Sequence, residues 1–293
     1  MSLLGEVGKH VKEILEGYPS GKSVKVTTTN DAGLTVNVDV DLTSKGAQGS
    51  VTASLANTKN SGVWFNLDRL QVKTDGRVAG EASYILDSEV DSRLYVIAED
   101  GRQEPGKPLK SFGKAGAKLT TSALDVDCSV DVINGPTFRA AALYSHKRSN
   151  LSAGVEAQVN THWEEKNAGS ELEDLNVSVA YSSAQWGLSA RTTDRMGMLT
   201  LAYLHRVDPI VTLGTQLDYG LKSNTQRFIL GAKWAVDSNT TVRAKIDSSA
   251  TLSAAFNHNL SDYAKISISA SVDSRDLSNN DRCNFGLGLE FNS

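Results

Sequence analysis

The feature that most constrains this chain is an alternation of apolar and polar residues that recurs along almost all of it after residue 23. In residues 35–42, three valines and a leucine alternate with Thr, Asn and Asp, and comparable patterns recur in 124–132, 227–236 and 263–273. Successive side chains of a strand point to opposite faces of the sheet. This period of two therefore predicts β-strands with one apolar face.

Short turn signals separate these runs. We count about nineteen strand candidates, mostly of nine to twelve residues, whereas strands of soluble proteins usually have about five or six. About nine to eleven residues suffice for a tilted strand to cross a bilayer. Longer polar inserts occur near 100–111 and 161–172. The turn signals are Asn30–Gly33, Lys45-Gly46, Asn60–Gly62, Asp75-Gly76, Asn134–Pro136, Lys222–Asn224 and Asp237–Asn239.

A soluble β-sandwich would show the same alternation, so the fold class depends on how the strands are connected. They follow one another through short turns over some 270 residues without helices between them. Closure into a barrel would remove the exposed edges of such a sheet. The apolar face is also modest in bulk, as suits contact with lipid. We predict an all-β transmembrane barrel of about 19 strands, with a soluble β-fold as the alternative.

Hydropathy alone would place the chain among soluble proteins. The N-terminus has no basic leader followed by an apolar core, and no stretch approaches the roughly 18 apolar residues of a membrane-spanning helix. Barrel strands, however, give only a weak signal per segment. The hydropathy therefore does not argue against the barrel.

One segment follows a helical period instead. In residues 4–17, the residues Val7, Val11, Ile14 and Leu15 share one helical face, and Gly17 ends the pattern. A helix this short is marginal in water, so we expect it to dock on a barrel wall or a membrane surface. We divide the chain into a helical segment, 1–22, and a barrel, 23–293, within one structural domain.

No arrangement of residues predicts catalysis. The five histidines lack metal-ligand spacing, and Cys128 and Cys283 fit ordinary strand thiols better than a disulfide framework. We therefore expect no enzyme activity, no metal and no cofactor. The net charge of −4 argues against a nucleic-acid partner, because such proteins usually carry a basic surplus.

The last third of the chain carries a specific resemblance. The stretch Trp234–Ser248, followed by Ser253–Phe256, resembles the signature of the eukaryotic mitochondrial porins, the voltage-dependent anion channel family. Trp234 and Phe256 depart from the residues usual there. Val7-Gly8-Lys9 with Glu13 and Gly17-Tyr18 looks like the family's N-terminal helix, Asn134–Thr137 resembles a family turn, and Asn284–Phe291 fits the sorting signal of its last strand.

This resemblance implies a fold and a location. The family's barrel has nineteen strands, so our strand count is not independent of the resemblance. The helix would lie in the lumen, and the last strand would pair with the first, with Phe285–Phe291 turning its apolar face to lipid. The location implied is the mitochondrial outer membrane. The insertion machinery would read residues of the last strand, which are Asn284, Gly286, Leu289 and Phe291.

The resemblance also implies a function, which is voltage-gated passage of ions and small anionic metabolites, including ATP, ADP and phosphate. Inward-facing cations would favour anions, although each such residue taken alone also fits an ordinary solvated charge. The candidates are Lys9, Lys12, Arg227, Lys233, Arg243, Lys245 and Lys265. The apolar helix face, Val7, Val11, Ile14 and Leu15, would take part in gating. Nucleotide contacts implied by the resemblance are Thr251, Leu252, Ser253, Ser269 and Asp273.

Two alternatives share the barrel. One is a component of the outer-membrane protein-import pore, and the other is a non-conducting scaffold that docks proteins through its rim loops, such as 101–111 and 161–172. The partners we expect are membrane lipid, small anionic metabolites and nucleotides. Self-association and other outer-membrane proteins stay open as further partners. Many family members are basic and this chain is net acidic, so its ion selectivity stays open as well.

Overall fold

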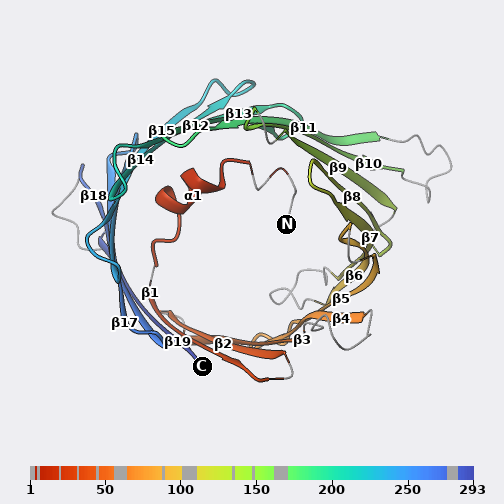
Figure 1. Ribbon diagram of the computed structural model, residues 1–293, viewed down its shortest axis with the longest axis horizontal. Coiled ribbons are helices and arrows are strands. Elements are labelled where there is room, and N and C mark those ends of the chain that lie inside the picture. The colour runs from red at the N-terminus through yellow and green to blue at the C-terminus, as the bar shows by residue number, and fades with distance from the viewer. Residues whose placement is uncertain are drawn as a thin grey trace.

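Nineteen strands form a single closed sheet in the part of the chain that the structure describes, and helix α1 (Lys9–Leu15) lies inside the ring (Figure 1). The structure is a computed structural model that describes residues 4, 7–19, 21–31, 33–43, 46–55, 65–87, 90–100, 111–133, 136–146, 149–161, 171–275 and 283–293. The predicted turns at 45, 60–62 and 134–135, and most of the inserts near 100–111 and 161–172, fall outside these residues.

The strands have eight to twelve residues each, close to the predicted length. They are β1 (Gly21–Thr29), β2 (Leu34–Thr43), β3 (Gly46–Leu55), β4 (Phe65–Lys73), β5 (Val78–Asp87), β6 (Ser92–Asp100), β7 (Phe112–Thr120), β8 (Leu124–Asp131), β9 (Thr137–His146), β10 (Leu151–Asn160), β11 (Glu171–Ser182), β12 (Trp186–Thr193), β13 (Met198–Arg206), β14 (Val211–Gly220), β15 (Gln226–Ala235), β16 (Thr240–Asp247), β17 (Thr251–Ser261), β18 (Ala264–Asp273) and β19 (Cys283–Asn292).

The sheet closes between its first and last strands. Every strand pairs with its neighbour in sequence in antiparallel fashion, whereas β1 pairs with β19 in parallel, with Val24 opposite Leu289. An odd number of alternating strands makes the last strand run in the same direction as the first, so the seam must be parallel. Main-chain bonds from Thr29 N–H to the Ser293 carbonyl and from Ser293 N–H to the Thr27 carbonyl extend the seam at one end. The predicted closure is confirmed.

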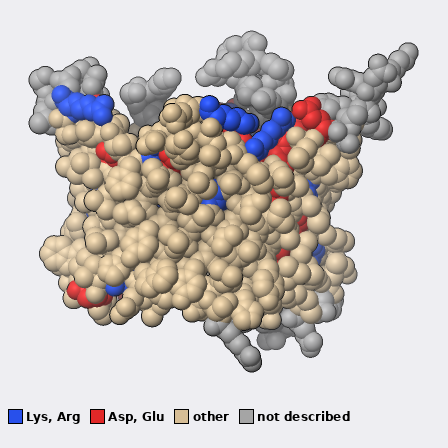
Figure 2. Space-filling view, turned by 90° about the horizontal axis from the view of Figure 1, so that it is seen from above, with Lys and Arg blue, Asp and Glu red and all other residues tan. Residues whose placement is uncertain are grey.

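The alternation sorts side chains between an outer belt and a lumen. On β19, Phe285, Leu287 and Phe291 lie on the outer face, where Phe285 is 72 % exposed. Figure 2 shows the outer face of the wall around β11–β15. Charged side chains gather mainly along its upper edge, and its middle is mostly uncharged. A broad apolar band bounded by polar rims is the arrangement that a bilayer requires of a barrel.

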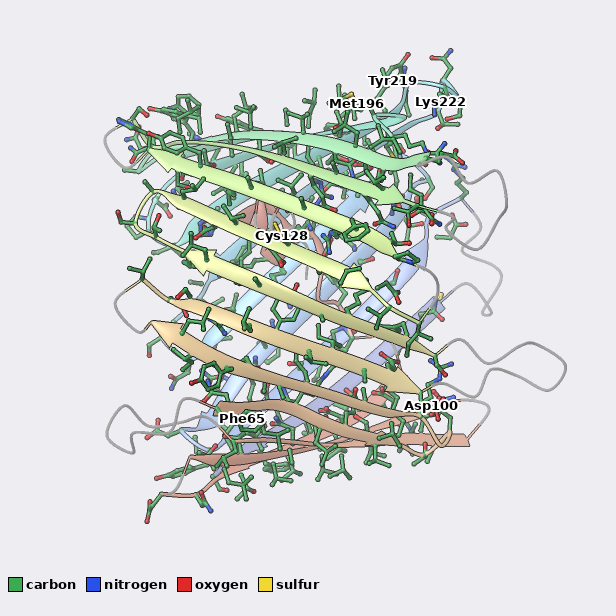
Figure 3. All side chains as sticks on the ribbon, turned by 90° about the vertical axis from the view of Figure 1, so that its right-hand side faces the viewer. Phe65, Asp100, Cys128, Met196, Tyr219 and Lys222 are labelled. Atoms are coloured by element: carbon green, nitrogen blue, oxygen red, sulfur yellow. The ribbon has the colours of Figure 1, made fainter. Side chains whose placement is uncertain are left out.

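Figure 3 shows the wall of β4–β10, which adjoins the wall of β11–β15 around the ring. Cys128 lies midway along the wall in Figure 3, while Phe65 and Asp100 lie at its two ends. Cys128 is exposed on the outer face, and both it and Cys283 are free thiols. Both cysteines lie in strands, as predicted.

The N-terminal helix is shorter than predicted. It runs from Lys9 to Leu15 rather than over 4–17, because Gly8 has a left-handed backbone (φ 80°) and breaks the helix before Lys9. Val7 stays buried in the turn before the helix. At the other end, β1 begins at Gly21, so the first barrel strand starts within the segment that we assigned to the helix.

Candidate functional site

The lumen is the candidate site, and helix α1 rests on one part of its wall. Val11, Ile14 and Leu15 of the helix form a buried cluster with Ala202 and Leu204 of β13 and Ile229 of β15. Leu204 and Ile229 stand on the inward, otherwise polar faces of their strands. The sequence carried a signal for this contact that we did not use. Uninterrupted apolar runs at 201–204 and 228–230 break the alternation at these positions.

Small inward residues form a track beneath the described residues of the N-terminal segment, Leu4 and 7–19. Gly231 illustrates why they are small, because a Cβ atom there would meet Leu15 Cδ2 at 2.6 Å. At the far end of the track, the Ser269 hydroxyl donates to the Pro19 carbonyl. The track lets the segment lie close against the wall from β10 to β19. Its residues are Gly154, Ser178, Ser189, Ala202, Gly214, Gly231, Ala255, Ser269 and Gly286.

Two cations of β16 bind the C-terminal end of the helix. Arg243 Nη1 donates to the carbonyls of Glu13 (2.8 Å) and Glu16 (3.0 Å), and Nη2 donates to that of Gly17 (2.8 Å). Lys245 Nζ donates to the Leu15 carbonyl (2.7 Å). The last carbonyls of a helix have no partner within it and carry the negative end of its dipole. Arg243 and Lys245 donate hydrogen bonds to these carbonyls and place positive charge beside the negative end of the dipole. We call this pair of residues the helix clamp.

Tyr18 completes the clamp from the other side. Its ring centroid lies 4.5 Å from Lys245 Nζ and 5.4 Å from Arg243 Cζ, within the range of cation–π attraction. Its hydroxyl donates to the Ile14 carbonyl (3.1 Å). Burial raises the pKa of the Tyr18 phenol above its ordinary value, and the nearby Arg243 charge opposes this only in part. The phenol therefore stays neutral at physiological pH.

All seven predicted cationic residues lie on the lumen side. Arg243 and Lys245 bind the helix, and Arg227 Nη2 lies 3.4 Å from Asp247 Oδ2. The other four border a cavity of about 980 Å³ between the helix and the wall of β15–β19 and β1. These four are Lys9, Lys12, Lys233 and Lys265.

Lys25 of β1 also lines this cavity and was not among the predicted cations. It shares the carboxylate of Glu290 with Lys265, at 3.8 Å and 3.5 Å respectively. Its position between Ser23 and Thr27, on the polar face of the alternation, was the available signal. The cavity thus combines several cations with the carboxylates of Glu13, Glu16 and Glu290.

The suggested nucleotide contacts are divided between the two faces. Thr251, Ser253, Ser269 and Asp273 stand on inward faces of β17 and β18, whereas Leu252 stands on the outer face and is 50 % exposed there. Strand alternation makes it impossible for Leu252 to contact a ligand in the lumen, so it is removed from the candidates. Ser253 and Ser269 are buried, and their hydroxyls bond to Ser271 (3.0 Å) and to the Pro19 carbonyl.

The four residues of the suggested insertion signal also divide by face. Asn284 and Gly286 of β19 face the lumen side, and Leu289 and Phe291 face outward. Gly286 lies directly beneath the Pro19 carbonyl. The motif therefore combines a lipid-facing pattern with a contact to the N-terminal segment.

Charge is distributed unevenly around the lumen. Among the described inward residues of β2–β11, there are eleven carboxylates and six Lys and Arg side chains. On β12–β19, β1 and residues 9–16, there are ten Lys and Arg side chains and six carboxylates. We call these the acidic half and the basic half. The carboxylates of the acidic half are Asp39, Asp41, Glu81, Glu99, Asp125, Asp127, Asp131, Glu156, Glu171, Glu173 and Asp174, and its cations are Arg69, Lys73, Arg93, Lys114, Lys118 and Arg139.

The basic half carries more cations than carboxylates. Its cations are Lys9, Lys12, Lys25, Arg191, Arg206, Arg227, Lys233, Arg243, Lys245 and Lys265. Its carboxylates are Glu13, Glu16, Asp218, Asp247, Asp273 and Glu290. The predicted selectivity residues therefore all belong to one half of the wall, the half on which the helix lies.

The described residues contain no group of three or more His, Cys, Asp or Glu side chains placed to hold a metal ion. None of their helices is long and apolar enough to cross a membrane. A closed sheet with an apolar outer belt and a charged lumen defines the class: a membrane pore barrel.

The comparisons with known proteins agree with this class. A family model described as eukaryotic porin matches residues 1–286, and the chain belongs to that family. It is 26% identical over 290 residues to the "Probable voltage-dependent anion-selective channel" of Caenorhabditis elegans, covering 98% of this chain and 96% of the relative. It is 20% identical to "Mitochondrial outer membrane protein porin 1" of Arabidopsis thaliana, covering 98% of both chains.

Two further matches extend the range of relatives. The "Non-selective voltage-gated ion channel VDAC2" of Xenopus laevis is 24% identical, over 97% of this chain and 96% of the relative. Among solved structures, a mutant of Rh. blastica porin superposes with a TM-score of 0.51 at 10% identity, covering 85% of this chain and 96% of that one. At that identity the likeness concerns the barrel fold alone.

Proposed function

We propose that this protein is a voltage-gated channel of the mitochondrial outer membrane through which ions and small metabolites diffuse. The observation that carries the proposal is a closed barrel whose lumen is charged and holds a cation-lined cavity beside a clamped helix. The names of the relatives, which are voltage-dependent channels and mitochondrial outer-membrane porins, support both the activity and the location. Catalysis is not part of this function.

The cavity suggests how anionic metabolites would pass. Lys12, Lys233 and Lys265 come from three separate elements and border one space. Phosphate groups of ATP, ADP or inorganic phosphate would be attracted there, because inward cations lower the electrostatic barrier for anions. The hydroxyls of Ser253 and Ser269 would become available to a nucleotide only if the N-terminal segment moved, since Ser269 binds the Pro19 carbonyl.

Gating would use the helix. The segment carries Lys9, Lys12, Glu13 and Glu16 inside the lumen, so a shift of the helix under voltage would rearrange charges in the conducting path. The helix clamp and the apolar face of Val11, Ile14 and Leu15 hold the conducting arrangement. Membrane lipid is the partner of the outer belt.

The test is the single-channel current of the purified protein in a planar bilayer, under a salt gradient and stepped voltage. The proposal expects an open state of nanosiemens scale that falls to lower conductance at either polarity. Absence of current from a barrel that circular dichroism and protease protection show to be folded and inserted would reject it.

A further inference from the structure

We propose that anions and cations cross this lumen along separate walls, and that small inorganic and organic cations use the acidic half. The proposal rests on the channel function proposed above and adds to it a second class of solute with its own route. Its starting point is the opposite charge excess of the two halves of the described wall.

The two walls are far enough apart to act separately. Strands about 4.8 Å apart and tilted by about 40° give a ring of nineteen strands a backbone diameter of roughly 35–40 Å. The Debye length is about 10 Å at 0.1 M salt. An ion near one wall is therefore screened from the charges of the other wall, and it responds to the local excess rather than to the average of the lumen.

Strand β8 is the centre of the acidic half. It lies across the lumen from α1 (Figure 1), and its inward face carries Asp125, Asp127 and Asp131 with Ser129 between them and no cation. The neighbouring strand β7 places Lys118 opposite Asp127 and Lys114 opposite Asp131. These lysines offset part of the charge locally.

The other strands of this half add more carboxylates than cations, so the half as a whole keeps an excess of negative charge. Inward carboxylates of β2, β5, β6, β10 and β11 outnumber the cations of the same strands. On β10 and β11, for example, the Glu173 carboxylate accepts hydrogen bonds from the uncharged amides of Gln158 (2.6 Å) and Asn160 (3.1 Å). Arg195, in the turn after β12, offsets only the neighbouring Glu171 (3.4 Å). A cation moving along this wall thus meets negative charge from several strands in succession.

The basic half offers the corresponding route for anions. Lys12 of the helix and Lys233 of β15 border the same cavity, which lies against the wall opposite β8. The helix occupies only this side of the lumen, where its element contacts are with β13–β16. A change in the helix should therefore alter the passage of anions much more than that of cations.

Two matched pairs of substitutions test this separation in planar bilayers. Asp125→Asn with Asp131→Asn removes two charges from the acidic half, and Lys12→Gln with Lys233→Gln removes two from the basic half. All four residues lie outside the helix clamp. The quadruple variant combines both pairs and keeps the net charge of the chain. Potassium and chloride conductances are derived from total conductance and reversal potential at about 0.1 M and at 1 M KCl.

If the two walls act separately, the quadruple variant should differ from the wild type in total conductance but not in reversal potential. At about 0.1 M, each pair should lower mainly the conductance of its own ion. The quadruple variant should then keep the wild-type reversal potential while losing roughly one fifth or more of its total conductance. At 1 M, where the Debye length is about 3 Å, all variants should conduct like the wild type, which also shows that they fold.

A lumen that acts through its average charge gives a different result. The quadruple variant would then recover both the wild-type reversal potential and the wild-type conductance at 0.1 M, and that outcome would overturn the proposal. A wild-type protein without any current would instead reject the channel function itself, so the two failures are distinguishable.

A second measurement needs only the wild-type protein. Inorganic triphosphate added at low concentration should lower the chloride conductance through the basic half and leave the potassium conductance unchanged. A rise in potassium conductance on addition of triphosphate would mean that a bound polyanion acts on the whole lumen, and it would also overturn the proposal.

Discussion

The guanidinium group of Arg243 donates a hydrogen bond of 2.8 Å to the main-chain carbonyl of Gly17, a residue 226 positions earlier in the chain. This contact lies just beyond the end of the helix, where the path to β1 begins. With the bonds to Glu13 and Glu16, one side chain of the barrel wall satisfies three carbonyls of the N-terminal segment. The polar contacts that hold the end of the helix therefore come from one strand, β16, whereas its apolar face packs on β13 and β15.

The first prediction concerns this contact. Arg243→Ala should weaken docking of the helix, because each hydrogen bond to a charged group contributes about 1.5–3 kcal/mol. We expect the reduced-conductance state to appear at lower voltage than in the wild type, measured from the conductance–voltage relation. Lys233→Ala is the matched control, since it removes a cation from the same cavity without a hydrogen bond to α1. Equal shifts for the two variants would contradict the role of the clamp.

The second prediction concerns the close approach of the helix to β15. Gly231→Ala should displace Leu15, because the new Cβ would lie 2.6 Å from Leu15 Cδ2, which is too short for a van der Waals contact. Gly80→Ala is the control, since nothing lies within 4 Å of a Cβ atom at that position. We expect altered gating for the first variant and wild-type gating for the second. Protease sensitivity of the N-terminal segment provides an independent measure of displacement.

The third prediction tests whether the seam between β1 and β19 is stabilised mainly by its main-chain hydrogen bonds or by the charge of Glu290. Glu290→Gln should change the melting temperature little, because exposed ion pairs contribute about 0–1 kcal/mol and the main-chain ladder of β1 and β19 stays intact. The same substitution frees Lys25 and Lys265 from their shared carboxylate, so the reversal potential should shift toward that of chloride. A large fall in melting temperature would show that this carboxylate, and not the ladder, dominates closure.

The fourth prediction uses the raised pKa of Tyr18. In the docked state the phenol stays protonated to higher pH than in a released segment, so the protonated form favours docking. Its contribution is complete below the ordinary phenol pKa of about 10 and is lost as the pH rises toward the raised value. Wild-type gating should therefore change between about pH 10 and about pH 12 more than that of Tyr18→Phe. Parallel pH profiles would assign the change to lysines instead.

The strands and their two faces could be predicted from the sequence because they depend on a local period. Phe285, Leu287 and Phe291 share the outer face as their spacing of two requires. The burial of Val11 and Ile14 followed from helical spacing in the same way. Closure of the last strand onto the first was predicted from the family resemblance, because no local pattern indicates that these two strands pair.

The contacts inside the lumen could not be predicted in this way. The bonds from Arg243 to Gly17 and from Ser269 to Pro19 join residues more than 220 positions apart, and nothing in either local sequence specifies the other. The left-handed Gly8 was also missed, since a glycine within an apolar period of four gives no warning that the helix starts after it. Leu252, by contrast, could have been excluded from the sequence, because its place between Thr251 and Ser253 in an alternating strand turns its side chain outward.

The parallel seam places Gly21 and Ser293 at opposite mouths of the pore, because two strands that run side by side in the same direction begin at one mouth and end at the other. The N-terminal segment therefore reaches the lumen through the mouth where β1 begins, and residue 293 emerges at the other. A fluorescent protein attached after Ser293 would stand on the far side of the membrane from that mouth. Such a fusion would report which mouth faces the cytosol without obstructing the one through which the helix is connected.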